Sequence, residues 1–250
     1  MSPASSVCAA EMPTISTLLA SAWAEYRRLP VYNDIVLWLI ALPSFGISII
    51  ERLGGVGDPY WPDYIAPDGV RWPLFGILLL LNIVIIWGAA TTLVAAEHPG
   101  KTHTFGALHK QAAPFIVPIL LTEVLRVCLT LLWALVLIVP GFIYSLRTML
   151  AQPIIVAEKL AYRPALQRSI QLVKGRSWEV ARVIIGTSLL LFLPIGFVTG
   201  LIEAVFTAAD PRLLALSDAL QAAVSGIASA VYIIVLVATY RHLKAHPHAA

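Results

Sequence analysis

Charged residues are scarce in this chain of 250 residues. Asp, Glu, Lys and Arg together make up 12% of it, whereas hydrophobic residues make up 59%. A soluble domain carries about 25% charged residues, so this chain has too few to cover a globule in water. The composition excludes an ordinary soluble protein and predicts an all-α, polytopic integral membrane protein.

Cysteine is also scarce, since Cys8 and Cys128 are the only two in the sequence. They lie far apart, and Cys128 is inside an apolar stretch, so we expect neither a disulfide framework nor a cysteine-rich metal site. His242 and His246 are four residues apart and could share a metal, but no cysteine or carboxylate completes a ligand pattern around them. We therefore expect no metal and no cofactor.

Recognisable catalytic motifs are missing from the sequence as well. It contains no Walker A loop, no G-x-S-x-G elbow, no H-E-x-x-H and no G-x-G-x-x-G. The first residues, MSPASSVCAAEMPTIS, have neither the basic start nor the apolar core of a cleavable signal peptide. We expect a protein that is not an enzyme and that is inserted by its first membrane-crossing helix.

Six apolar stretches predict membrane-crossing helices, of which the fourth is short. They are 33–50, 73–96, 114–138, 142–157, 181–204 and 218–240. Pro140-Gly141 is expected to turn the chain before the fourth crossing, and Pro153 to interrupt that crossing. The predicted division of the chain is a flexible tail (1–13), a six-helix membrane domain (14–244) and a second flexible tail (245–250).

Three further segments, 14–30, 102–113 and 161–176, show the spacing of apolar residues that is typical of amphipathic helices. Each precedes two predicted crossings, and a similar Pro-Gly signature recurs in LPSFG, VPGF and LPIGF. This order predicts three helical hairpins, each preceded by an amphipathic helix at the membrane surface, and raises internal duplication as a hypothesis. For 14–30 the alternative is a helix packed on the protein's own loops.

The 17 Lys and Arg residues are distributed unevenly along the chain. With six crossings and both termini inside, twelve lie on the inner side and three on the outer side, while Arg126 and Arg147 lie within crossings, which accounts for all 17. The positive-inside rule therefore predicts that the N-terminus and the C-terminus are both cytoplasmic.

The segment 159–182 is the most basic part of the chain. Its positive residues are expected to contact anionic lipid head groups on the cytoplasmic side of the membrane. These residues are Arg163, Arg168, Lys174 and Arg176. Because apolar residues alternate with them at helical spacing, the pattern favours a membrane surface over nucleic acid.

Four strongly polar residues, Asn82, Glu123, Arg126 and Arg147, fall within predicted crossings at similar depth. Glu123 and Arg126 are three residues apart and can pair on one helix face. Charges in hydrocarbon are costly and often mark a ligand or a transport path, so one interpretation is a site for an anion or a lipid head group. The other interpretation, which we favour because six short crossings leave little room for a cavity, is an ion-pair network that fixes helix packing. The guanidinium of Arg147 could also reach the outer surface of the membrane, because the aliphatic part of its side chain is long.

One stretch carries a recognisable succession of short motifs. They are Pro140-Gly141 followed by Arg147, Ala151-Gln-Pro153, Val156-Ala-Glu158, Pro164-Ala-Leu-Gln-Arg-Ser169 and Lys174-Gly-Arg-Ser-Trp178. In these features the stretch 139–182 resembles the membrane domain of bacterial glycerophosphoryl diester phosphodiesterases and of related stand-alone polytopic proteins. The resemblance implies an integral membrane module of largely unassigned role. In those enzymes a separate barrel domain performs the hydrolysis, and nothing in this chain corresponds to it.

The sequence thus predicts a non-enzymatic module of the bacterial inner membrane that contacts or organises lipids, or that acts as a partner subunit or homo-oligomer. The alternative is a small transporter or permease component for an anionic or lipid-like substrate, which would use the intramembrane polar residues. Nucleic acid is not expected as a partner.

Overall fold

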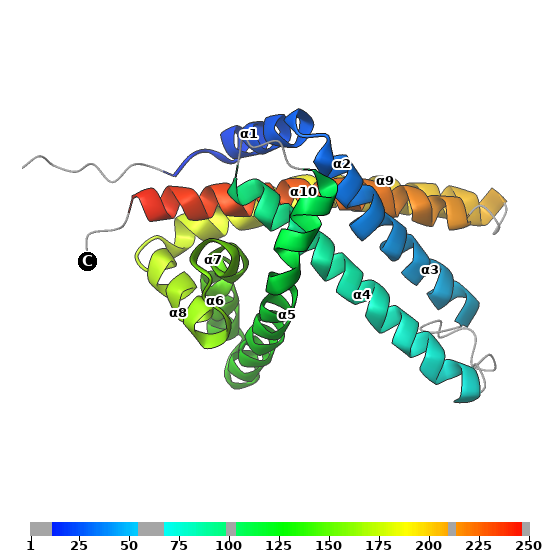
Figure 1. The fold of residues 1–250 in the computed structure, drawn as a ribbon, viewed down its shortest axis with the longest axis horizontal. Helices are drawn as coiled ribbons and strands as arrows, with labels where there is room; N and C mark the ends of the chain where they lie inside the picture. The colour runs from blue at the N-terminus through cyan, green and yellow to red at the C-terminus, as the bar shows by residue number, and fades with distance from the viewer. Residues whose placement is uncertain (1–11, 55–67, 99–103, 210–213, 247–250) are drawn as a thin grey trace, which may run out of the picture.

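The computed structural model describes residues 12–54, 68–98, 104–209 and 214–246, and within these ranges every regular element is a helix (Figure 1). The helices are α1 (Ile15–Arg28), α2 (Val31–Ile35), η1 (Val36–Ala41), α3 (Leu42–Gly54), α4 (Asp68–Glu97), α5 (Phe105–Val136), α6 (Ile138–Thr148), α7 (Ala151–Glu158), α8 (Tyr162–Val173), α9 (Ser177–Ala209) and α10 (Leu214–Ala245). The predicted all-α architecture is confirmed for the described part of the chain.

Six stretches of this structure are long and apolar enough to cross a membrane. They are Val31–Ile50, Pro73–Glu97, Phe105–Val136, Ile138–Glu158, Ser177–Phe206 and Ser217–Ala245. Each overlaps one of the six predicted crossings. Helices satisfy their own backbone hydrogen bonds in hydrocarbon, which is why apolar stretches of this length mark crossings so directly.

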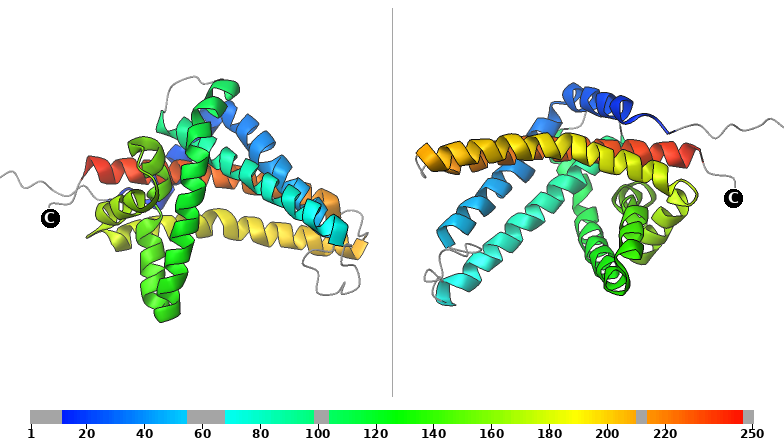
Figure 2. Two further views of the ribbon diagram at one scale, coloured as in Figure 1. Left: turned by 60° about the horizontal axis from the view of Figure 1, so that its bottom comes forward. Right: turned by 180° about the vertical axis from the view of Figure 1, so that it is seen from behind.

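The long helices pack in pairs that diverge from a common region. α3 lies along α4, α5 along α6, and α9 along α10, and the three pairs point in different directions (Figures 1 and 2). α10 is the central helix, because it contacts α1, η1, α3, α4 and α9. Its buried hydrophobic residues extend from Ala222 to Leu243, whereas Leu193 and Phe197 on α9 are exposed. The core therefore surrounds α10, and the far ends of the pairs present apolar surface.

The first crossing is continuous but changes its helical geometry before Pro43. Pro43 has no N–H, so the carbonyl four residues earlier, on Leu39, loses its usual donor. The π-helical segment η1 lies immediately before this point, and the Leu42 N–H donates to the carbonyl of Leu37, one residue further back than in an α-helix. This wider turn lets the chain pass the proline without ending the helix.

The turn before the fourth crossing lies at Leu137, so the prediction that Pro140-Gly141 makes the turn is wrong. Leu137 is extended (φ −157°, ψ 131°), and α6 begins at the next residue. Pro140 falls in the first turn of α6, where its missing N–H costs no helical bond. Gly141 serves a different purpose, because a Cβ there would come within 2.7 Å of the backbone nitrogen of Ala134. Its missing side chain allows α5 and α6 to approach closely.

The fourth crossing is interrupted at Met149 and Leu150, which separate α6 from α7. The prediction of a break at Pro153 is therefore wrong by a few residues. Pro153 is the third residue of α7, and a proline in the first turn of a helix removes no hydrogen bond that the helix would make. The interruption precedes the proline and leaves two short helices.

The predicted amphipathic segment 102–113 is not a separate helix. α5 begins at Phe105 and continues to Val136 through Pro114 and Pro118. Thr104 precedes it in an extended conformation, as expected of an N-cap, although its side chain makes no capping bond. A continuous helix satisfies more backbone groups than two helices with a break between them, which favours this arrangement in a membrane.

α1 and α8 are separate short helices, as the sequence predicts. On α1, Leu18, Ala22 and Tyr26 are buried, and this helix contacts α9 and α10. Burial raises the pKa of Glu25 on α1, although the charges of Arg241 and Arg28 and a hydrogen bond from Tyr32 oppose the shift.

The predicted tails fall largely outside the described residues. Of the first tail, 1–13, the structure describes Met12 and Pro13, and Met12 is buried in the core. Of the second, 245–250, it describes Ala245 at the end of α10 and His246, whose N–H donates to the carbonyl of His242.

Candidate functional site

Two of the four predicted intramembrane polar residues meet in the structure. Arg126 donates from Nε to the Oε1 and Oε2 atoms of Glu123 at 3.0 and 3.1 Å, and its Nη2 also donates to Oε1. The side chains of Arg126 and Glu123 are 19% and 33% exposed. Both lie on α5, so the spacing of three residues predicted this ion pair correctly.

A third polar residue, Gln152, joins the pair from α7. Its Nε2 donates to Oε2 of Glu123 at 3.4 Å. Sequence analysis missed Gln152, although an amide within an apolar stretch next to Pro153 was a signal for it. Glu123 and Gln152 line a groove of about 290 Å³ between α4, α5 and α7. We call this the α5 groove.

The walls of the α5 groove are mostly apolar. α4 contributes Ile86 and Ala89, and α5 contributes Ile119, Leu120, Val124, Val127 and Cys128. This lining can bind a molecule with two kinds of surface. The apolar walls suit an alkyl chain, and Glu123 and Gln152 can exchange hydrogen bonds with a polar group.

A second positive charge lies near the ion pair, but it comes from α8 and not from Arg147. The backbone N–H of Tyr162, the first residue of α8, donates to Oγ1 of Thr122 at 2.8 Å. Thr122 directly precedes Glu123 on α5, and the exposed Arg163 directly follows Tyr162 on α8. A cation close to the pair favours an anionic group.

The predicted four-residue cluster does not form, because Asn82 and Arg147 lie elsewhere. Asn82 is exposed, and its Nδ2 donates to the carbonyl of Leu78 on its own helix at 2.9 Å. Arg147 is also exposed, and its Nε donates to Oγ of Ser177, at the start of α9, at 3.4 Å. Arg147 is thus joined to the start of α9, and no hydrogen bond links it to the Glu123–Arg126 pair in the described residues.

The four basic residues predicted to contact head groups divide into two kinds. Arg163 and Lys174 are exposed, and Arg168 is partly exposed and pairs with Glu158. Arg176 is only 5% exposed, and its Nε lies 2.8 Å from Oε2 of Glu179. The placement of Arg176 on an exposed basic face is therefore wrong. α8 ends at Val173, and the left-handed Gly175 (φ 84°) then turns the chain, so Arg176 no longer follows the helical spacing.

Sequence analysis also missed a polar network centred on Glu158, the last residue of α7. Its Oε1 accepts from the hydroxyl of Tyr240 at 2.9 Å and lies 3.4 Å from Nζ of Lys244. Its Oε2 accepts from Nε of Arg168 at 3.0 Å. These contacts join α7, α8 and α10. Nearby on α10, Arg241 lies 3.6 Å from the carboxylate of Glu97 at the end of α4.

Removing the charge of Glu158 is expected to destabilise the protein. Glu158→Gln should lower the free energy of unfolding by about 2 kcal/mol, because charge-assisted hydrogen bonds from three side chains weaken together. The change can be measured by thermal unfolding in a mild detergent. Asp34→Asn removes an exposed carboxylate and should cost less than about 0.5 kcal/mol. Equal losses in the two variants would contradict the role of this network.

No protein-family model, no curated protein and no solved structure matches this chain. The resemblance of 139–182 to the membrane domain of bacterial glycerophosphoryl diester phosphodiesterases therefore stays a prediction. Any functional proposal has to be argued from the residues of the sites themselves.

Proposed function

We propose that this chain is a non-enzymatic integral membrane module of the bacterial inner membrane that binds a membrane lipid in the α5 groove. The observation that carries the proposal is the lining of that groove, where Glu123 and Gln152 accompany otherwise apolar walls and Glu123 is paired with Arg126. A lipid combines an alkyl chain with a polar group, and the groove offers a surface to each.

The head group is an anionic one in this proposal. Glu123 engages Nε and Nη2 of Arg126, and a guanidinium carries five N–H donors, so the Nη1 side of Arg126 can donate to a phosphate. Arg163 adds a second positive charge at the start of α8, where the N–H of Tyr162 donates to Thr122 beside Glu123. The ion pair thus holds Arg126 in place, and the remaining positive charge attracts the ligand.

The proposal also includes the orientation of the protein in the membrane. Both termini are cytoplasmic, α1 and α8 lie at the inner surface, and the pairs α3–α4, α5–α6 and α9–α10 are three hairpins. The positive-inside rule supports this orientation, with twelve inner against three outer Lys and Arg residues. Further support comes from Arg168 and Lys244, which reach the same carboxylate of Glu158 from α8 and α10. The middle of α8 and the C-terminal part of α10 therefore lie close together, beside the end of α7.

The α5 groove contains its own reporter, because Cys128 lines it. A Cys8→Ser variant leaves Cys128 as the single cysteine, which can carry a trifluoroethyl label for ¹⁹F NMR. Addition of phosphatidylglycerol to the detergent-solubilised protein is expected to shift the label resonance saturably. Phosphatidylcholine should require roughly tenfold more lipid for the same shift, because its head group carries no net charge.

The Glu123→Gln/Arg126→Gln double variant should lose this preference, because the ion pair is neutralised without leaving a lone charge. Arg147→Gln removes a positive charge that lies outside the groove and should keep the preference. If phosphatidylglycerol leaves the resonance unchanged, or if the double variant still prefers it, the α5 groove is not the lipid site.

A further inference from the structure

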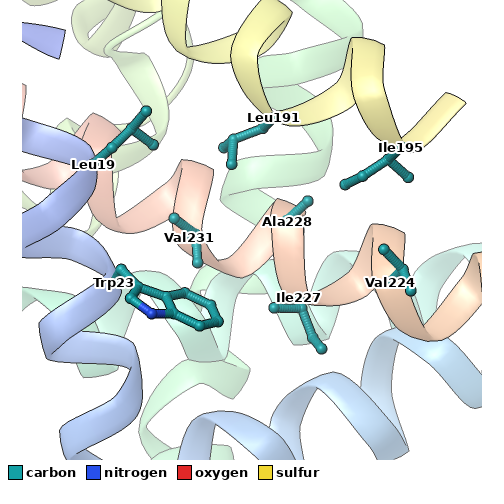
Figure 3. A pocket seen from close by; sticks show the side chains of 8 residues that line it. All are labelled: Leu19, Trp23, Leu191, Ile195, Val224, Ile227, Ala228 and Val231. Atoms are coloured by element: carbon teal, nitrogen blue, oxygen red, sulfur yellow. The ribbon is translucent and has the colours of Figure 1, made fainter. Parts of the chain in front are cut away.

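A second groove, of about 340 Å³, lies between α1, α9 and α10 (Figure 3). Its lining includes Leu19 and Trp23 of α1, Leu191 and Ile195 of α9, and Val224 and Val231 of α10, all of which are apolar. Trp23 is 46% exposed, so the edge of the groove at α1 is open. We call this the α1 groove. It shares no residue with the α5 groove.

α1 presents different residues along its two edges. Beside the buried row of Leu18, Ala22 and Tyr26, the next row places Leu19 and Trp23 in the α1 groove. Arg27 continues that row four residues after Trp23 and is exposed. Residues four apart lie on one helix face, so Arg27 continues the face of α1 that carries Leu19 and Trp23.

On the other edge of α1, Arg28 lies near the acidic side chain of Glu25. Arg28 is exposed, and its charge acts on Glu25, as does the charge of Arg241 near the end of α10. The two neighbouring arginines therefore face different surroundings. Arg27 lies on the same helix face as Leu19 and Trp23, whereas Arg28 lies beside the carboxylate of Glu25.

We propose that the α1 groove holds one acyl chain of an anionic phospholipid, with Arg27 contacting its phosphate. The volume lies at the lower end of the range for ligand pockets, which suits a single chain better than a whole lipid. A tryptophan with an apolar body and a polar N–H favours the boundary between chains and head groups, where Trp23 would lie. An arginine next to that boundary offers a bidentate contact to a phosphate.

This proposal does not rest on lipid binding in the α5 groove, because other helices form the site and Arg27 is remote in sequence from Arg126. The two are also tested separately. The label on Cys128 reports on the α5 groove, whereas the variants below change only α1 and α10. Either proposal can fail while the other holds.

The test uses the full chain in nanodiscs of phosphatidylethanolamine and phosphatidylglycerol at a ratio of 3:1, followed by native mass spectrometry after transfer to mild detergent. The unaltered protein should retain phosphatidylglycerol in preference to phosphatidylethanolamine. Val224→Trp fills the groove and should lower the number of retained phosphatidylglycerol molecules by one per protein, whether or not the α5 groove holds another. Leu220→Trp adds the same side chain one turn earlier, at a residue that is 45% exposed and outside the groove lining, and should leave retention unchanged.

A second pair of variants tests the head-group contact without changing the groove. Arg27→Gln should lower the preference for phosphatidylglycerol about fivefold, as expected for one arginine near an anionic surface. Arg28→Gln makes the same change in net charge and should leave the preference within twofold of the original. This comparison decides the matter even if Val224→Trp fails to fold. Equal losses in the two arginine variants, or full retention of lipid in Val224→Trp, would overturn the proposal.

Discussion

Glu123→Gln is expected to lower the free energy of unfolding by about 3 kcal/mol, because it leaves Arg126 without its counter-charge inside the bilayer. In the structure the Arg126 guanidinium donates to both carboxylate oxygens of Glu123. Gln at this position keeps the shape and one acceptor but loses the charge. Thermal unfolding of the protein in a mild detergent would measure the loss.

The double variant distinguishes an unpaired charge from a lost hydrogen bond. Glu123→Gln/Arg126→Gln has neither charge, and two amides can still bond to each other and to Gln152. We therefore expect it to be more stable than Glu123→Gln by about 2 kcal/mol. The comparison also needs the single variant Arg126→Gln. If the losses in unfolding free energy of Glu123→Gln and Arg126→Gln simply add in the double variant, the two residues are not coupled and the pair does not stabilise this part of α5.

Gly141→Val is the second substitution with a large expected effect, a loss of about 3 kcal/mol in the free energy of unfolding. A Cβ at this position would lie 2.7 Å from the backbone nitrogen and 2.8 Å from the Cα of Ala134. Both atoms belong to the main chain of α5, so no side-chain rotation can relieve the clash. α5 and α6 would have to move apart, and their shared contact would be lost.

Gly196→Ala is the matched control, because a Cβ added to that residue of α9 meets no atom within 4 Å. It should keep or slightly raise the stability, since alanine is the better helix former. Thermal unfolding of both variants in the same detergent makes the comparison. A Gly141→Val protein that unfolds at the temperature of the unaltered chain would show that α5 and α6 do not need their close contact.

Features that depend on local spacing were predicted well from the sequence. Hydropathy over about twenty residues located all six crossings, because a membrane helix must satisfy its own backbone and present apolar side chains. The Glu123–Arg126 pair was likewise predicted, since residues three apart share a helix face whatever the tertiary fold.

Contacts between distant residues were not predicted, because helical spacing contains no information on which helices meet. Gln152 is 29 residues from Glu123, Ser177 is 30 residues from Arg147, and Tyr240 is 82 residues from Glu158. The break in the fourth crossing was predicted at Pro153 but lies at Met149 and Leu150, because a proline in the first turn of a helix is tolerated.

Membrane thickness is expected to influence how α9 lies in the bilayer. The apolar stretch Ser177–Phe206 of α9 has 30 residues and is about 45 Å long at 1.5 Å per residue, whereas the hydrocarbon core of a bilayer measures about 30 Å. A stretch of this length is accommodated by tilting of the helix, by kinking or by local thickening of the bilayer. α9 packs along α10, so a change of its tilt in a thinner or thicker membrane would also involve the central helix of the core.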